Sequence, residues 1–266
     1  MPEQIPTIVV FDSGLGGLTV FREIAAARPD ARYVYVADDV AFPYGELPEP
    51  AMIDRVNKVI GEEIVRSAPD LVVIACNTAS TIALTHVRAR FEVPFVGMVP
   101  AIKPACAKSR SKLVSVLGTR ATVTREYTKG LIREFAQDCD VTLVGAAKLA
   151  SLAEAKLNGA AADSDAIAAE IAPCFVEKNG KRTDTIVLAC THYPLLLECM
   201  RKLSPWPVDW LDPAPAIARR VVELLGPPQQ RNQPVPAQFS FTSGKSTSAA
   251  LARVLATFGF AATENA

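Results

Sequence analysis

The chain has 266 residues, half of them hydrophobic, and its 28 basic and 28 acidic side chains give a formal net charge of zero. This length suffices for two modest domains, and the charge balance argues against nucleic acid as a partner. No apolar run is long enough to predict a membrane span, and the first residues lack the pattern of a signal peptide. The six scattered cysteines exclude a disulfide scaffold and favour a reducing, cytoplasmic setting.

The first part of the chain alternates short apolar runs with amphipathic segments. The β-branched runs bounded by polar residues predict buried parallel strands, and apolar residues at helical spacing predict the helices between them. The predicted strands are residues 7–11, 33–37, 72–75 and 94–100, and the predicted helices are residues 18–27, 52–67 and 80–91.

The same pattern begins afresh near residue 112. Strands are predicted at 112–117, 141–145, 186–189 and 208–211, and helices at 125–135, 149–157, 163–176 and from Pro213 to 225. A connection rich in proline and glutamine at 226–238 precedes a strand at 239–244 and a helix at 246–258. Both halves share strand order and polar strand ends, which indicates a weak internal duplication.

This repetition predicts two similar open-sheet α/β domains related by pseudo-symmetry, with the active site in the cleft between them. The first unit ends near residue 98 without a late helix, so we expect the C-terminal segment to cross back to it. The predicted domains are therefore residues 1–98 plus 212–266 and residues 99–211.

Two loops at predicted strand ends carry candidate binding groups. Residues 12–17 form a glycine-rich turn that does not fit the dinucleotide fingerprint, because Thr19 stands where a third glycine belongs. Its backbone N–H groups suit a small anion such as a carboxylate, although Asp12 and Ser13 alone fit a helix N-cap equally well. The loop at residues 38–45 contains Pro-Tyr-Gly, which presents groups to a cleft or forms an ordinary surface turn.

An apolar run ending in Ala-Cys occurs twice, at Cys76 and at Cys190. Each cysteine lies at the carboxyl end of a predicted strand, where ligands bind in open α/β sheets and helix N–H groups can stabilise a thiolate. We interpret His86 as a packed or surface residue. The remaining cysteines are interpreted as core residues: Cys106, Cys139, Cys174 and Cys199.

Two thiols facing one cleft admit several kinds of chemistry. Redox pairs usually hold both sulfurs in one turn, zinc lacks ligands beyond His192, and a cysteine hydrolase leaves one thiol redundant. Acid–base chemistry on the two faces of one carbon uses both thiols equally, since a thiol pKa near ~8.5 can be brought towards working pH. No metal is predicted, and no lysine stands in a context typical of a pyridoxal Schiff base, so no cofactor is expected.

Five motifs, in family order and spanning almost the whole chain, resemble those of the glutamate racemases in the aspartate/glutamate racemase superfamily. They are residues 10–18, 40–45, 76–80, 118–122 and 190–194. The resemblance implies a cofactor-independent enzyme that interconverts L- and D-glutamate and supplies D-glutamate for peptidoglycan.

The same resemblance implies roles for individual residues. Cys76 would act on the D-antipode and Cys190 on the L-antipode, with Asp12 assisting Cys76 and with His192 and Glu154 assisting Cys190. Hydroxyls and N–H groups suit the carboxylates of a substrate without adding net charge. The implied substrate-binding residues are Ser13, Pro43, Tyr44, Gly45, Asn77, Thr78, Thr119, Thr122 and Thr191.

Residues 40–46 and 152–156 also resemble the branch of the family that is activated by a uridine-linked cell-wall precursor, which makes such a molecule a candidate partner. A homodimer is a candidate assembly, and neither nucleic acid nor membrane is an expected partner. Asp212-Pro213-Ala214 departs from the Asp-Ser-Gly of some members, which leaves the role of that loop open.

Two other functions compete with this one. A racemase of aspartate or another small amino acid is the nearest, although aspartate racemases commonly carry glutamate where this chain has His192. A non-catalytic dicarboxylate-binding protein is the alternative from a different class, and the presence of both cysteines disfavours it.

Overall fold

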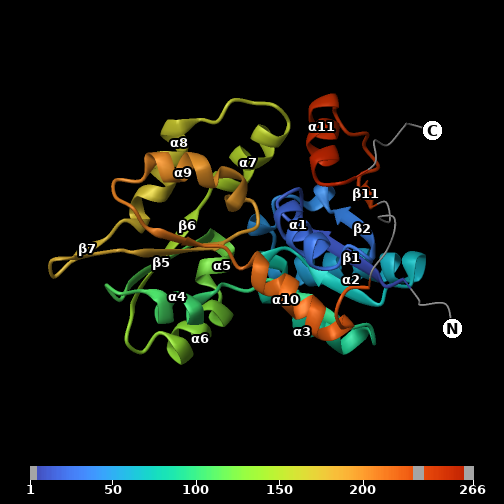
Figure 1. Cartoon of the computed structure of the whole chain (residues 1–266), viewed down its shortest axis with the longest axis horizontal. Helices are drawn as coiled ribbons and strands as arrows, with labels where there is room; N and C mark the ends of the chain where they lie inside the picture. Colours follow the sequence, from blue (N-terminus) through green and yellow to red (C-terminus); the bar gives the residue numbers. More distant parts are fainter. Residues whose placement is uncertain (1–4, 230–236, 261–266) are drawn as a thin grey trace.

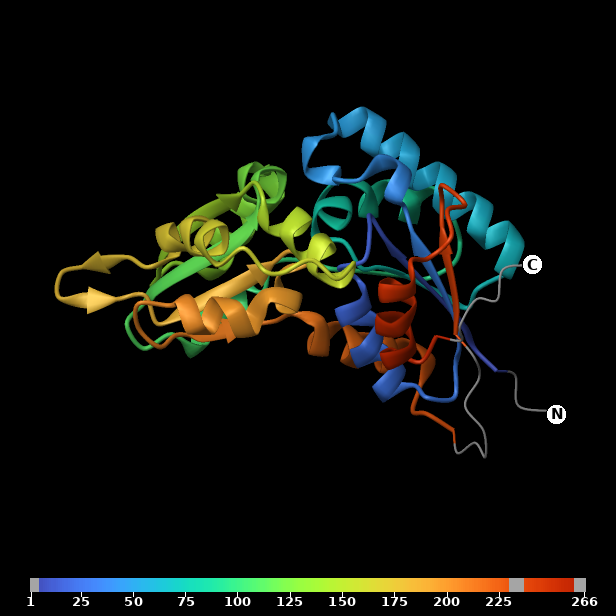
Figure 2. The same cartoon turned by 90° about the horizontal axis from the view of Figure 1, so that it is seen from above.

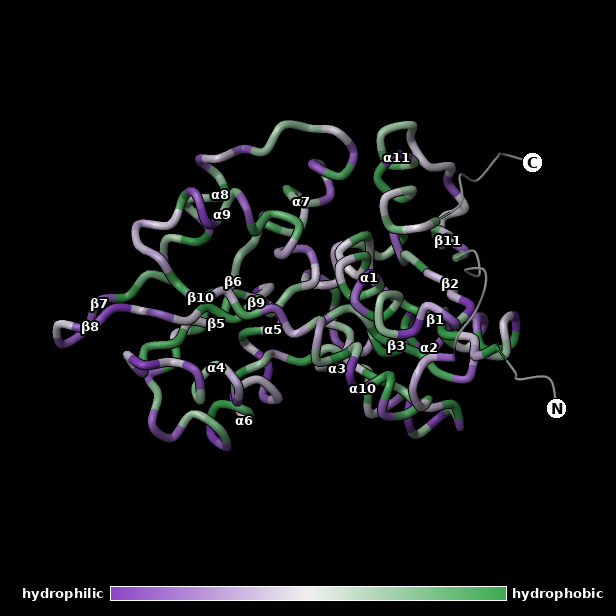
Figure 3. Tube along the Cα trace, in the orientation of Figure 1, coloured by the Kyte–Doolittle hydropathy of each residue, from purple (hydrophilic) through white to green (hydrophobic). Residues whose placement is uncertain are grey.

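Two parallel β-sheets, each in its own lobe, organise the computed structural model of this chain, which describes residues 5–229 and 237–260 (Figure 1). Viewed from above, the lobes lie side by side, and the first and last described elements, β1 and α11, belong to the same lobe (Figure 2). Hydrophobic stretches run through both sheets, whereas hydrophilic residues predominate in the hairpin at the far end of the other lobe (Figure 3).

The first sheet has the strand order β11-β2-β1-β3-β4, with every neighbouring pair parallel. Its strands are β1 (Thr7–Asp12), β2 (Arg32–Ala37), β3 (Leu71–Ile74), β4 (Phe95–Gly97) and β11 (Gln238–Phe241). Ile8 and Val10 of β1 pack on one face, and Val9 and Phe11 pack on the other, so apolar clusters form on both faces. Helices must therefore cover both faces of this sheet.

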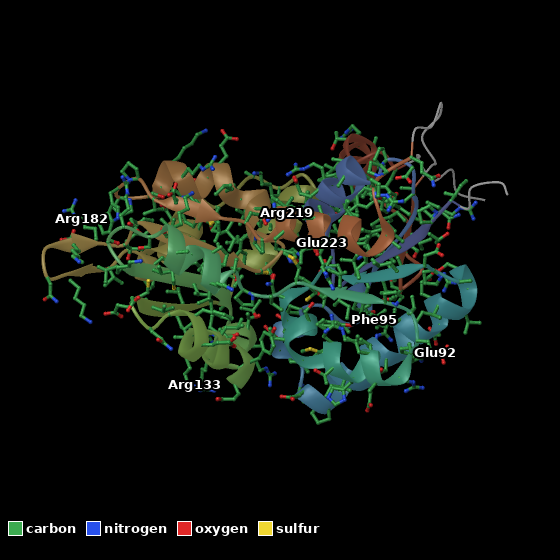
Figure 4. All side chains as sticks on the ribbon, turned by 60° about the horizontal axis from the view of Figure 1, so that its bottom comes forward. Glu92, Phe95, Arg133, Arg182, Arg219 and Glu223 are labelled. Carbon is green, nitrogen blue, oxygen red and sulfur yellow. The ribbon has the colours of Figure 1, made fainter. Side chains whose placement is uncertain are left out.

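The second face of this sheet is covered by α2 (Glu49–Ser67) and α3 (Asn77–Arg90), and the first by α1 (Leu18–Ala27), α10 (Ala214–Leu225) and α11 (Ala249–Thr257). The C-terminal segment thus packs on the lobe in which the chain begins. Arg219 and Glu223 project from the exposed side of α10 (Figure 4). We propose the domain division 1–98 plus 212–266 and 99–211 on the basis of this topology.

The second sheet has the order β10-β9-β5-β6. Its strands are β5 (Leu113–Thr119), β6 (Asp140–Ala146), β9 (Thr185–Ala189) and β10 (Asp209–Leu211). Its helices are α4 (Ile102–Lys108), α5 (Arg120–Thr124), α6 (Glu126–Phe135), α7 (Leu149–Leu157), α8 (Ser164–Ile171) and α9 (Leu197–Leu203). The order β6-β5-β9-β10 repeats the order β2-β1-β3-β4 of the first sheet, which confirms the prediction of two similar α/β units.

Some predicted elements differ from the observed ones. The helix expected at 163–176 ends at Ile171, because Pro173 cannot continue it and lies in the 3₁₀ turn Ala172–Cys174. The predicted strand at 94–100 shortens to β4, and Gln238 opens β11 rather than ending the connection, most of which lies outside the described residues.

Several short elements were not predicted. Helices α4 and α5 are short, with seven and five residues, and carry little periodic signal. The hairpin of β7 (Glu177–Lys178) and β8 (Lys181–Arg182) turns through Asn179-Gly180, both at positive φ. Asn-Gly between two short runs is a strong hairpin signal that was available in the sequence. In the part of the chain that the structure describes, no helix combines the length and apolarity of a membrane span.

Candidate active site

The carboxyl ends of the two sheets meet at the boundary between the lobes. Asp12 ends β1 and Cys76 lies just after β3, whereas Thr119 ends β5 and Cys190 directly follows β9. Side chains from the two lobes approach closely here: the hydroxyl oxygens of Thr78 and Thr119 are 3.0 Å apart. Ligands of open α/β sheets bind at such strand ends.

Cys76 occupies the N-cap of α3, where its Sγ accepts a hydrogen bond of 3.4 Å from the Ala79 N–H. The Ser13 hydroxyl lies 3.4 Å from the same sulfur. Burial raises the pKa of Cys76 to about 12, and the nearby negative charges of Asp12 and Cys190 add to the rise, whereas the contacts with Ser13 and Ala79 oppose it. Cys76 is therefore a neutral thiol in the ligand-free protein, and a bound cation would favour its thiolate.

This buried thiol predicts a dependence of stability on alkaline pH. The folded pKa of Cys76 lies above the unfolded value of 9.0, so its contribution is fully present below about pH 9 and is lost as the pH rises to about 12. Relative to Cys76→Ala, we expect the wild type to lose about 1.4 kcal/mol of unfolding free energy per pH unit above pH 9. Urea unfolding of both proteins under reducing conditions measures this difference. The contributions of the other titrating groups are common to both proteins and cancel. A difference that is independent of pH would contradict it.

Cys190 has a histidine and a carboxylate as neighbours. Its Sγ lies 3.8 Å from Nδ1 of His192, whose Nε2 lies 2.8 Å from Oε1 of Glu154 on α7. Burial opposes a charge on His192, but the contacts with Cys190 and Glu154 outweigh it and raise the pKa of His192 well above its usual value. The arrangement therefore places a protonated imidazole beside the second thiol.

The glycine-rich turn of the first lobe contacts this histidine–carboxylate pair. The Leu15 N–H donates to Glu154 Oε1 at 2.7 Å, and the Gly16 nitrogen lies 3.2 Å from His192 Nε2. Nε2 cannot both donate to Glu154 and accept from Gly16, and the raised pKa of His192 favours donation to Glu154. A Cβ at Gly16 would lie 2.4 Å from His192 Nδ1, so only glycine permits this approach.

Asp12 is completely buried at the base of the same turn. Its Oδ2 accepts hydrogen bonds from the N–H groups of Gly14 at 3.1 Å and Gly17 at 3.0 Å. Its Oδ1 lies 3.5 Å from the Thr191 hydroxyl. Burial raises the pKa of Asp12, against the lowering effects of His192 and the two N–H groups. The N-cap of α1 is Gly17 without a side-chain cap bond, so Asp12 supports the turn from outside the helix.

Three hydroxyls form a triangle across the lobe boundary. The oxygens of Thr78, Thr119 and Thr122 lie 3.0 to 3.1 Å from one another. Beside Thr78, the Asn77 side chain is buried and neither its Oδ1 nor its Nδ2 has a hydrogen-bond partner among the described residues. An unpaired buried amide costs free energy, so this one suits a polar ligand.

The Pro-Tyr-Gly loop lies at the same boundary. Pro43 and Gly45 line a cavity of about 110 Å³ together with Thr119 and Ser151 of the second lobe. The Tyr44 ring is buried, however, and its hydroxyl donates to Asp38 at 2.6 Å. The structure therefore brings together all the predicted catalytic and binding residues, with the phenol of Tyr44 engaged by another side chain.

Sequence reasoning missed several neighbours of this site. The Phe42 ring packs at 5.6 Å from the His192 ring, and the Thr19 hydroxyl donates to the Thr191 carbonyl at 3.2 Å. The Tyr35 hydroxyl supports the glycine-rich turn through the Gly14 carbonyl. Glu154 is an ordinary helix charge in the sequence without the family resemblance, and its contacts with His192 and Leu15 become visible only in the packed structure. Among the described residues, no group of three or more acidic, histidine or cysteine side chains is arranged to hold a metal.

Comparisons with known proteins agree with this geometry. The family model described as Asp/Glu/Hydantoin racemase matches residues 18–221. The chain belongs to this family and is an isomerase of the racemase class. The match confirms the resemblance to the aspartate/glutamate racemase superfamily.

Several similar proteins are named glutamate racemases, which confirms the resemblance to that group. One from Brucella canis is 57% identical over 219 residues, which cover 82% of this chain and 79% of the relative. The crystal structure of the Escherichia coli glutamate racemase in complex with L-glutamate and the activator UDP-MurNAc-ala matches with a TM-score of 0.85 and 40% identity over 97% of this chain and 96% of that one. The enzyme of Aquifex pyrophilus matches with a TM-score of 0.71 and 28% identity, over 95% and 94%.

Proposed function

We propose that this chain interconverts L- and D-glutamate by proton transfer between Cα and two cysteines. The observation that carries the proposal is the pair of thiols at matching strand ends of the two lobes, Cys76 and Cys190, each beside its own ionisable groups. Relatives named glutamate racemases at up to 57% identity support glutamate as the substrate.

The proposed reaction needs one base and one acid on opposite faces of the substrate. A thiolate takes the Cα proton, so a C–H bond breaks and an S–H bond forms, leaving the electron pair on the substrate. The opposite thiol then gives its own proton to the other face of Cα, which forms the antipode and leaves that sulfur as a thiolate. Proton exchange with water, or turnover in the reverse direction, restores the starting state.

The neighbours of each thiol give it a different environment. At Cys190, the protonated imidazole of His192, paired with Glu154, lies beside the sulfur. At Cys76, burial and the charge of Asp12 oppose the thiolate, so we propose that the ammonium group of the substrate lowers the pKa of this thiol on binding. We further propose that Asp12 assists Cys76, in which case the raised pKa of Asp12 suits a group that exchanges a proton.

The proposed substrate contacts are neutral polar groups around the two sulfurs. The unpaired amide of Asn77 and the hydroxyl triangle are suited to a carboxylate at the lobe boundary. The proposed set comprises Ser13, Asn77, Thr78, Thr119, Thr122 and Thr191, with main-chain groups of Pro43, Tyr44 and Gly45.

A racemisation assay on glutamate and aspartate, carried out side by side in heavy water, tests this function. We expect glutamate to racemise much faster, and newly formed antipode to carry deuterium at Cα while unreacted substrate stays largely protiated at early times. Preferred turnover of aspartate would overturn the substrate, and binding without turnover would indicate a dicarboxylate-binding protein. Retention of the original proton in the product would indicate one base working on both faces.

The helpers predict an asymmetric response to substitution. Asp12→Asn is expected to change mainly the Cα isotope effect measured from D-glutamate, because the charge of Asp12 acts on Cys76. His192→Asn is expected to change mainly the isotope effect measured from L-glutamate, because His192 contacts Cys190. Competitive isotope effects in both directions measure this. Identical responses of both variants in both directions would contradict separate helpers.

We also propose that a uridine-linked cell-wall precursor activates the enzyme and that its D-glutamate serves peptidoglycan synthesis in the cytoplasm. The E. coli relative, whose structure contains UDP-MurNAc-ala, supports this. Initial rates with and without that molecule are the test, and equal rates would refute activation. Sedimentation at assay concentrations decides whether the chain forms the homodimer considered as its assembly.

A further inference from the structure

Asp38 is a buried carboxylate that the proposed reaction does not use. It follows β2, is 0% exposed, and accepts hydrogen bonds from Tyr44 Oη at 2.6 Å, Arg55 Nε at 2.8 Å and Thr242 Oγ1 at 2.6 Å. Burial alone would raise the pKa of Asp38, but the bonds from Arg55, Thr242 and Tyr44 outweigh it and lower the pKa. The site therefore holds a charged carboxylate with donors from three separate segments.

The segment that follows β11 also binds the next residue, Asp39. The Ser243 N–H donates to Asp39 Oδ1 at 3.0 Å, and the Ser243 hydroxyl donates to Oδ2 at 2.7 Å. The Lys245 ammonium lies 2.9 Å from the same carboxylate. Residues 242–245, which we call the C-terminal clasp, thus hold Asp39, the first residue of the loop 39–46, and Asp38, which precedes it.

The loop 39–46 extends from this clasp to the reaction site. The Phe42 ring lies 5.6 Å from the His192 ring, and a Cβ built on Gly45 lies 3.4 Å from Thr119 Cβ of the opposite lobe. Between them, the buried Tyr44 ring packs against Phe11 with 6.3 Å between centroids. Tyr44 therefore anchors the loop through Asp38, while its neighbours on either side face the second lobe.

From this geometry we propose that Thr242 and Asp38 are positioning residues, through which the C-terminal clasp holds the loop 39–46 in its substrate-binding conformation. The inference rests on the proposed function, because that function assigns Pro43, Tyr44 and Gly45 to the substrate. It adds the segment after β11 to the residues that support the site, although Thr242 and Asp38 lie 204 positions apart in the sequence.

Thr242→Val tests the proposal, because valine keeps the shape of threonine and removes only the hydroxyl that donates to Asp38. We expect KM for glutamate to rise about tenfold while kcat stays within about twofold, since a loosened loop weakens binding before it affects proton transfer. General destabilisation would instead lower the active fraction and the apparent kcat at unchanged KM. Thr242→Ser restores the hydroxyl and is expected to return KM to the wild-type value.

Hydrogen exchange of the loop gives a readout that needs no turnover. Amides of residues 39–46 are expected to exchange faster in Thr242→Val than in the wild type or Thr242→Ser. Thr257→Val is the matched control, because within the described residues the hydroxyl of Thr257 donates only to the Val254 carbonyl at the end of α11. It is expected to leave both KM and loop exchange unchanged.

The outcomes separate this inference from the proposed function. Wild-type KM in Thr242→Val, or loop exchange unchanged from the wild type, would overturn the positioning role even if glutamate is racemised normally. A wild-type protein that does not racemise glutamate would refute the proposed function, and the exchange experiment would still decide whether the clasp holds the loop.

Discussion

Replacing either Cys76 or Cys190 by serine is expected to lower kcat/KM for glutamate by on the order of 10³-fold in both directions. A serine hydroxyl fits the volume of a thiol but ionises far less readily, so neither proton abstraction nor its reverse proceeds efficiently. Circular dichroism of D- and L-glutamate solutions measures the rate, with the concentration of folded enzyme determined by thermal unfolding.

Cys199→Ser is the matched control for this loss. Cys199 lies on α9, is partly exposed and belongs to the packing of the second lobe rather than to the lobe boundary. We expect its kcat/KM to stay near the wild-type value. Substantial racemisation by either active-site serine variant would end the two-thiol mechanism.

Gly16→Ala is the second substitution with a large expected effect. The added methyl would lie 2.4 Å from the His192 ring and 2.6 Å from the His192 backbone nitrogen, atoms of the opposite lobe. The lobes must therefore separate or the histidine must move. A shift of about 1 Å in catalytic groups can cost on the order of 10²-fold, so we expect at least that loss in kcat/KM.

Gly130→Ala on α6 provides the control, because the nearest atom to its added Cβ is 3.8 Å away at the end of the flexible Arg133 side chain. This variant should keep full activity. Small-angle scattering is expected to show a larger radius of gyration for Gly16→Ala alone. Wild-type kcat/KM in that variant would show that contact between the glycine-rich turn and His192 is not required.

Local patterns were sufficient for the elements that position the thiols. The helices at 18–27 and 149–157 were predicted to the residue, because each has an unbroken apolar pattern between polar or glycine boundaries. Both cysteines were correctly placed at strand ends for the same reason: β3 and β9 are buried on both faces and read as continuous apolar runs.

Contacts between segments that are distant in the sequence could not be predicted from such local patterns. Asp38 reads as one polar residue after a strand, and Thr242 as one residue of a strand edge, although their side chains meet. The approach of Leu15 to Glu154 likewise joins positions 139 apart in the sequence. No periodicity encodes such pairs, because they follow from how two lobes and a returning C-terminal segment pack together.

The two thiols have unequal neighbours, and this inequality has a kinetic consequence. L- and D-glutamate have identical free energies in solution, so the Haldane relation requires kcat/KM to be the same in both directions for the wild type and for every variant. The contrast between Asp12 near Cys76 and the His192–Glu154 pair near Cys190 can therefore never favour one antipode at equilibrium. It can only change how the same kcat/KM ratio is divided between kcat and KM, so KM is free to differ between the two antipodes.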